Sequence, residues 1–283
     1  MRFCDVSFDE ILSDGAGIGL ALSRSRTMRF LELKDMPSVS QRKRIFKSVK
    51  ALLLRRILLI CSSDLDLRCN TARLESLSLP GNLLSNNSHI ISTLLNESAC
   101  TSHSIFSRLV RLDLSSNPLT FDVVPRLCSF IKELQYLDSL DLSSTQMSQG
   151  IREPLMKDFA QSVVSSSLRR VSLARNRLGH FAITFLKAVV SCGTSSSRTI
   201  ECIDLSANLI RADDLRAMLV QPSFRVALKL VNLDMSLNCF DTEIASRALG
   251  QLTDNFSCFP LAESAACDGI QATSWADRQS LIR

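Results

Sequence analysis

The 283-residue sequence predicts an α/β solenoid, with short parallel strands on one side of a repeating array and helices on the other. Three observations lead to this fold class. A short pattern of apolar residues recurs along the chain, its copies begin about 30 residues apart, and the segments between copies place apolar residues at helical spacing.

The clearest copy of the pattern covers residues 109–119 and reads LVRLDLSSNPL. Leu112 and Leu114 are two residues apart, which is the spacing of a short strand with one buried face. Asn117 follows where the alternation stops, and a polar side chain there is suited to bond backbone groups that a turn leaves unpaired.

Six copies of the pattern begin at residues 74, 109, 137, 168, 200 and 230, so successive copies are 35, 28, 31, 32 and 30 residues apart. Asn occupies the turn position in five copies, and Thr145 replaces it in the third. Such regular recurrence predicts a repeat architecture in which each unit buries its flanks against its neighbours.

The segments between the copies predict helices. Leu127, Ile131 and Leu134 lie at helical spacing, as do Phe185 and Val189. We expect Asp213 and Asp241 to be N-caps of helices that follow their strands.

The repeated LxxLxLxxNxL pattern resembles that of leucine-rich repeat proteins over roughly residues 74–250. Units of this length are similar to those of the ribonuclease-inhibitor-like subclass. This resemblance implies a curved horseshoe with parallel strands on the concave side and helices on the convex side.

The sequence divides into three parts: degenerate N-terminal repeats or a cap over 1–73, six recognisable repeats over 74–254, and a C-terminal cap with a weakly ordered tail over 255–283. The first part carries 14 Lys and Arg against 8 Asp and Glu. Much of this charge lies in residues 41–56, which read as a basic helix. The helix is either the solvated outer helix of a repeat, or a contact for an anionic surface or nucleic acid, or a nuclear import signal.

The composition of the chain bears on its location and on whether it binds a metal or a cofactor. The sequence has no apolar run long enough to span a membrane, and acids interrupt its first ten residues, so we expect a cytoplasmic protein, with the nucleus as the alternative. The ten cysteines include no Cys-x-x-Cys pair, and we expect neither a metal nor a cofactor.

Three columns of side chains are expected on the concave face, one between the two strand apolar positions and one on either side of it, because strand residues alternate between two sides. Neighbouring aspartates there would repel one another unless screened, and we expect adjacent serines to donate to them and arginines to neutralise part of their charge. The candidate partner-binding residues are Arg111, Asp113, Asp141, Arg170, Asp204 and Asp234. The alternative is that Leu-Asp-Leu-Ser is only the usual strand of the family.

We therefore expect a non-enzymatic scaffold or adaptor that binds a protein partner on its concave face. His89, His103 and His180 all lie outside the strand pattern, and no Ser/His/Asp or Cys/His set is recognisable. Two alternatives follow from similar proteins. One is a regulator of another enzyme, in a GTPase-activating or ubiquitin-ligase substrate-recognition role, for which Arg175 and Arg177 are the nearest loop arginines. The other is an actin-cytoskeleton regulator similar to tropomodulin.

Overall fold

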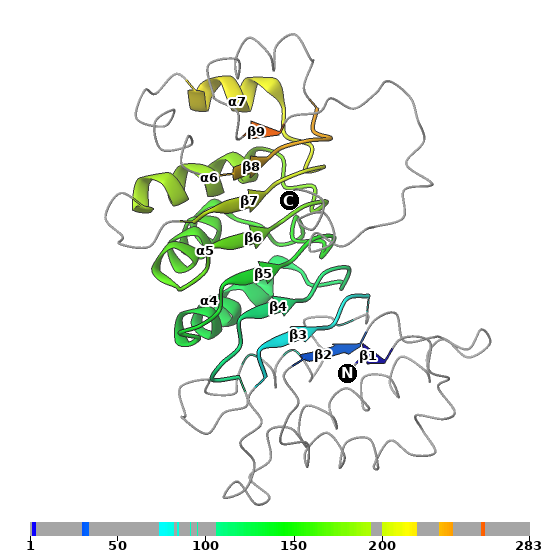
Figure 1. Cartoon of the computed structure of the whole chain (residues 1–283). Coiled ribbons are helices and arrows are strands. Elements are labelled where there is room, and N and C mark those ends of the chain that lie inside the picture. The colour runs from blue at the N-terminus through cyan, green and yellow to red at the C-terminus, as the bar shows by residue number, and fades with distance from the viewer. Residues whose placement is uncertain are drawn as a thin grey trace, which may run out of the picture.

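A computed structural model of the chain describes residues 2–3, 30–33, 74–81, 84, 91, 95, 106–193, 200–219, 232–239 and 256–257. Within these residues, nine strands form one parallel sheet in sequence order, with helices beside it (Figure 1). The strands are β1 (Arg2–Phe3), β2 (Phe30–Leu33), β3 (Ser76–Ser78), β4 (Arg111–Asp113), β5 (Ser139–Asp141), β6 (Arg170–Ser172), β7 (Cys202–Asp204), β8 (Asn232–Asp234) and β9 (Phe256–Ser257).

The strands β3 to β8 coincide with the six copies of the sequence pattern, which confirms the α/β class and the parallel sheet. Their central residues are aligned across the sheet: Leu77, Leu112, Leu140, Val171, Ile203 and Leu233. β2 lies within the predicted degenerate N-terminal repeats, and β1 and β9 extend the sheet at its two ends, where no individual strand is predicted above.

The described helices are α4 (Val124–Glu133), α5 (Glu153–Ser165), α6 (His180–Gly193) and α7 (Ala212–Leu219). They lie on one side of the strands and follow one another in sequence order (Figure 1). Pro125 and Pro154 stand in the first turns of α4 and α5, where a missing N–H costs no helical hydrogen bond. Each of these helices lies between two consecutive strands in the sequence.

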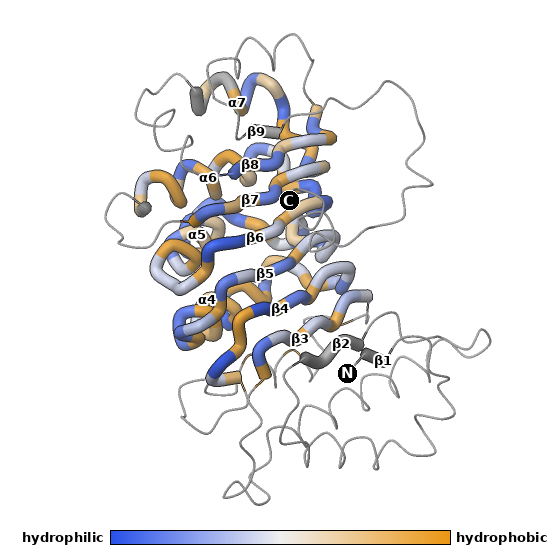
Figure 2. Tube along the Cα trace, viewed as in Figure 1, coloured by the Kyte–Doolittle hydropathy of each residue, from blue (hydrophilic) through white to orange (hydrophobic). Residues whose placement is uncertain are grey.

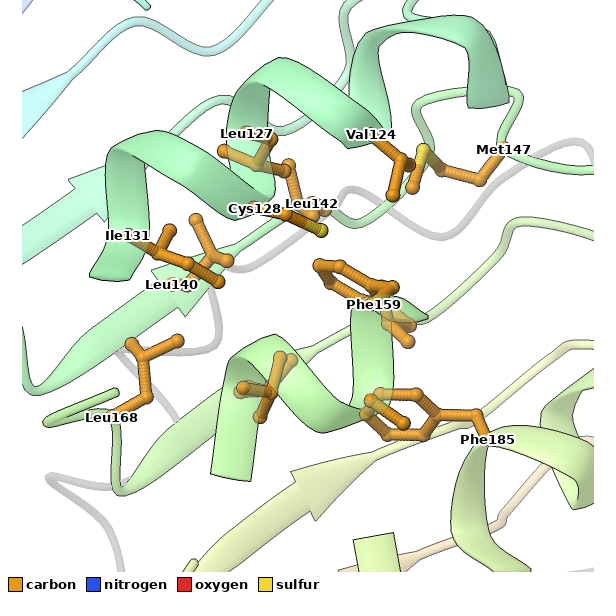
Figure 3. Packing of buried hydrophobic residues seen from close by; sticks show 14 of the residues in the cluster. Val124, Leu127, Cys128, Ile131, Leu140, Leu142, Met147, Phe159, Leu168 and Phe185 are labelled. Atoms are coloured by element: carbon orange, nitrogen blue, oxygen red, sulfur yellow. The ribbon is translucent and has the colours of Figure 1, made fainter. Parts of the chain in front are cut away.

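The hydrophobic core lies between the sheet and these helices, and the hydrophobic residues of both are orange in Figure 2. Leu140 from the sheet side lies beside Ile131 of α4, and Leu142 lies between Leu127 of α4 and Phe159 of α5 (Figure 3). Phe159 also stacks on Phe185 of α6, with ring centroids 5.7 Å apart. Consecutive units thus share one continuous core rather than closing separately.

Several sequence predictions have a definite outcome. The buried faces predicted for the helices at Leu127 and Phe185 are confirmed. The N-cap prediction for Asp213 is wrong, because α7 begins at Ala212 and Asp213 lies in its first turn. Asp214 accepts from the Arg211 N–H at 3.4 Å, which satisfies one of the donors that precede the helix.

Other predictions fall where the structure describes little or nothing. Four of them lie outside the described residues: the basic helix at 41–56, the turn asparagine of the first copy (Asn82), the N-cap at Asp241 and the tail over 258–283. None of the helices in the described part of the chain is long and apolar enough to cross a membrane.

Candidate functional site

The side chains that flank the buried central residue of each strand from β3 to β8 lie on the face of the sheet opposite the core, which we call the open face, although Ser172 and Asp204 on it are buried. The central residues point into the core, so their neighbours point to the other side of the sheet. The open face consists of Ser76 and Ser78, Arg111 and Asp113, Ser139 and Asp141, Arg170 and Ser172, Cys202 and Asp204, and Asn232 and Asp234. All six candidate residues predicted from the sequence therefore lie on this one face.

Two pairs of aspartates face each other across neighbouring strands of the open face. Asp113 of β4 is aligned with Asp141 of β5, and Asp204 of β7 is aligned with Asp234 of β8. Ser172 of β6 separates the two pairs. The adjacent carboxylates carry like charge at a separation of about one strand, which is an unfavourable arrangement without compensation.

Backbone hydrogen bonds supply part of the compensation. In each aspartate, Oδ1 accepts the N–H of the serine two residues later, at 2.9 Å for Asp113, 2.8 Å for Asp141, 2.9 Å for Asp204 and 2.9 Å for Asp234. These bonds end the strand and begin the turn in the manner of an Asx-turn. The aspartates therefore have a structural role, whatever else the open face does.

In each aspartate pair, a serine of the preceding strand donates a hydrogen bond to one of the two carboxylates. Ser78 Oγ donates to Asp113 Oδ2 at 2.7 Å, and Ser172 Oγ donates to Asp204 Oδ2 at 3.2 Å. These contacts agree with the prediction that adjacent serines donate to the stripe. The preceding-strand neighbours of Asp141 and Asp234 are aspartates, which offer no such donor.

The environment of the open face raises the pKa of two carboxyl groups. Burial, followed by the negative charge of Asp113, raises the pKa of Asp141 to about 6. Burial also raises the pKa of Asp204, and the charge of Asp234 adds to the effect. Both groups are harder to ionise than ordinary aspartates, so a nearby cation would stabilise their charged forms.

The two candidate arginines differ in their surroundings. Arg170 forms an ion pair with Asp138, so its charge serves a carboxylate outside the aspartate stripe. This contact departs from the prediction that Arg170 neutralises the stripe itself. Arg111 is exposed, and it makes no ion pair with another described residue.

Sequence reasoning missed an ion-pair network at the start of the strands. Arg169 lies 3.2 Å from Glu201 and 3.8 Å from Asp138, so Asp138 contacts two arginines. Asp138, Arg169 and Glu201 each directly follow the first apolar residue of a copy, in three successive copies. Arg170 comes one place later in the second of these copies. Aligning the copies by their leucines places the opposite charges in neighbouring units, and this was the signal available in the sequence.

The remaining candidates for catalysis or metal binding are the histidines and groups of metal-ligating side chains. Among the described residues, no group of three or more His, Cys, Asp or Glu side chains is placed to hold a metal ion. His180 begins α6, is exposed and contacts the ring of Phe181, while His89 and His103 lie outside the described residues.

Comparisons with known proteins do not identify the chain. Neither the protein-family models nor the curated proteins contain a match to its sequence.

Proposed function

We propose that the chain is a leucine-rich repeat protein of the ribonuclease-inhibitor-like subclass and that it binds a protein partner on its open face without catalysing a reaction. In this proposal the open face is the concave side of a horseshoe and α4 to α7 lie on the convex side. The supporting features are the aligned strands, the helices α4 to α7 that follow β4 to β7, and the recurrent turn asparagine.

The observation that carries the proposal is the pairing of Asp113 with Asp141 and of Asp204 with Asp234 on the open face. A cationic side chain placed beside either pair would reduce the repulsion between its carboxylates. The electrostatic complement of this face is therefore a basic segment of a protein.

The dimensions of the face suit an extended segment. The five intervals from β3 to β8 span about 24 Å at the usual strand separation. An extended chain of about seven residues has this length. Lys or Arg side chains in such a segment would lie over both pairs, in which Asp113, Asp141 and Asp234 are partly exposed and Asp204 is buried. The buried Ser172 separates the two pairs.

Affinity capture from a cell lysate tests the proposal. The bait is the wild-type chain beside a variant with Asp113, Asp141, Asp204 and Asp234 all changed to Asn, which keeps an oxygen to accept each turn N–H. A control variant changes four exposed acids away from the open face, namely Asp122→Asn, Asp158→Asn, Asp213→Asn and Glu153→Gln. A partner retained by wild type and control but lost by the open-face variant supports the proposal. Identical captured proteins for all three baits contradict it.

A further inference from the structure

A second surface lies at the carboxyl ends of β6 and β7, in the turns that follow these strands. It consists of Arg175, Arg177 and Leu209, which we call the turn patch. All three side chains are exposed, and Leu209 is 50% exposed, which is unusual for a large apolar residue in the described part of this chain. The turn patch is separate from the open face, whose aspartates lie within the strands.

The backbone of the turn patch is held in a left-handed conformation. Arg175 has a φ of 57° and Arg177 a φ of 56°, while Leu209 has a φ of 61°. Non-glycine residues reach these angles at a cost in free energy. Asn176, between the two arginines, is buried, so the two neighbouring side chains are directed out of the turn.

Hydrogen bonds between neighbouring turns hold the backbone on both sides of Arg177 and of Leu209. The N–H groups of Asn176 and Leu178, which flank Arg177, donate to Asn208 Oδ1 at 3.0 and 3.3 Å. In the next turn, the N–H groups of Asn208 and Ile210, which flank Leu209, donate to Asn238 Oδ1 at 2.8 and 3.0 Å. Arg177 and Leu209 therefore occupy equivalent places in adjacent turns.

The two guanidinium groups are available to a ligand. Neither Arg175 nor Arg177 forms an ion pair with any residue that the structure describes. Arginine binds carboxylates through two parallel hydrogen bonds, and it is frequent among the residues that dominate protein interfaces. Because the turn backbone is already ordered, binding there would cost less conformational entropy than binding to a mobile loop.

We propose that the turn patch docks an acidic segment of a protein partner, whose carboxylates pair with Arg175 and Arg177 while an apolar side chain covers Leu209. Charge complementarity decides the choice of occupant, because two exposed arginines without an ion pair to any described residue lie near one exposed apolar side chain. This surface has the opposite charge to the open face, so the two would select different segments. The inference does not depend on the function proposed for the open face.

The test uses a fluorescein-labelled peptide of alternating Glu and Leu residues, titrated with the full chain by fluorescence anisotropy. The double variant Arg175→Gln/Arg177→Gln is expected to weaken binding about tenfold or more. Gln is compatible with this backbone, because Gln146 has a φ of 61° at the place equivalent to Arg177 in the preceding turn. Leu209→Asn, which suits the left-handed conformation, is expected to weaken binding about fivefold.

The control is Arg108→Gln/Arg126→Gln, which removes two exposed positive charges elsewhere and should change affinity by less than about twofold. Circular dichroism confirms that every variant is folded. The proposal is overturned if wild type shows no saturable binding, or if the control loses as much affinity as the turn-patch variant. It is also overturned if a single-stranded oligonucleotide displaces the peptide and loses affinity in the same variant, since the patch would then bind nucleic-acid phosphates.

Discussion

The Asn176 side chain joins its own turn to the turn of the preceding unit, which contains Thr145. Asn176 Oδ1 accepts the Thr145 N–H at 2.8 Å and the Met147 N–H at 3.2 Å. Its Nδ2 donates back to Leu142 O at 2.7 Å and to Leu173 O at 3.0 Å. Because Asn176 is buried, water cannot replace these bonds, so the amide couples the stability of two units.

Asn176→Ala is predicted to destabilise the fold strongly. The change leaves buried backbone groups of two units without partners, and the expected loss is about 3 kcal/mol in the free energy of unfolding. Urea unfolding followed by circular dichroism measures it. Asn232→Ala removes an exposed side chain and should cost less than about 0.5 kcal/mol. Similar losses for both variants would show that the buried amide does not join the units.

Thr145→Asn is predicted to stabilise the fold by about 1 kcal/mol. Thr145 donates to Leu142 O within its own unit at 2.6 Å, and none of its hydrogen bonds with described residues reaches the preceding unit. An asparagine would present an Nδ2 toward Leu114 O, in the way that Asn176 reaches Leu142 O. The comparison is with Thr145→Val in the same urea experiment, which should destabilise. Equal destabilisation by Asn and Val would mean that the site cannot accept the amide.

Asp141→Asn is predicted to make stability less dependent on pH. The pKa of Asp141 is about 6 in the folded chain, above its ordinary value of 3.8, so between these pH values the folded state binds more protons than the unfolded state. Stability therefore falls as pH rises through this interval. Asn keeps an acceptor for the Ser143 N–H and removes the charge, and we expect it to add about 2 kcal/mol at pH 7.5 but little at pH 4.

Urea unfolding of wild type and Asp141→Asn at several pH values measures this difference. Carboxyl NMR signals followed through the same range report the titration of Asp141 directly. A stability gain that is the same at pH 4 and pH 7.5 would contradict the pKa shift.

Asp138→Ala is predicted to cost more stability than Arg169→Ala. Asp138 contacts both Arg169 and Arg170, and its side chain is mostly buried, whereas the Arg169 side chain is 60% exposed. We expect a loss of about 2 kcal/mol for Asp138→Ala and below about 1 kcal/mol for Arg169→Ala. A double-mutant cycle between Asp138 and Arg170 measures their coupling. A coupling near zero would show that the contact does not stabilise the folded chain.

The repeated strands were predictable because each needs only a local pattern, such as Leu112 and Leu114 two residues apart before Asn117. β1 and β9 were not, because a two-residue strand at the end of a sheet is specified by its neighbour's free backbone groups and not by its own side chains. The start of α7 was misplaced because Asp213 resembles a cap by residue type, while Asp214 makes the observed contact with the preceding N–H.

The candidate site was predictable to a similar degree. Strand alternation placed Asp113 and Asp141 on one face and in adjacent strands. It did not reveal that each carboxylate accepts a turn N–H, which depends on backbone geometry, or that Arg170 turns to Asp138, which depends on a neighbouring unit.

Fluorescence anisotropy with a labelled Lys- and Arg-rich peptide of about seven residues, the length that the open face accommodates, tests the central claim most directly. The peptide is titrated at pH 7.5 and pH 5 with wild type, the four-aspartate variant and the control lacking four acids elsewhere. We predict that the four-aspartate variant binds about tenfold or more weakly at pH 7.5 than wild type and the control. We also predict that wild type and the control both lose affinity at pH 5, because Asp141 is then mostly protonated, whereas the four-aspartate variant does not. Equal affinity for all three chains at both pH values would contradict the claim that the aspartates of the open face form the binding site.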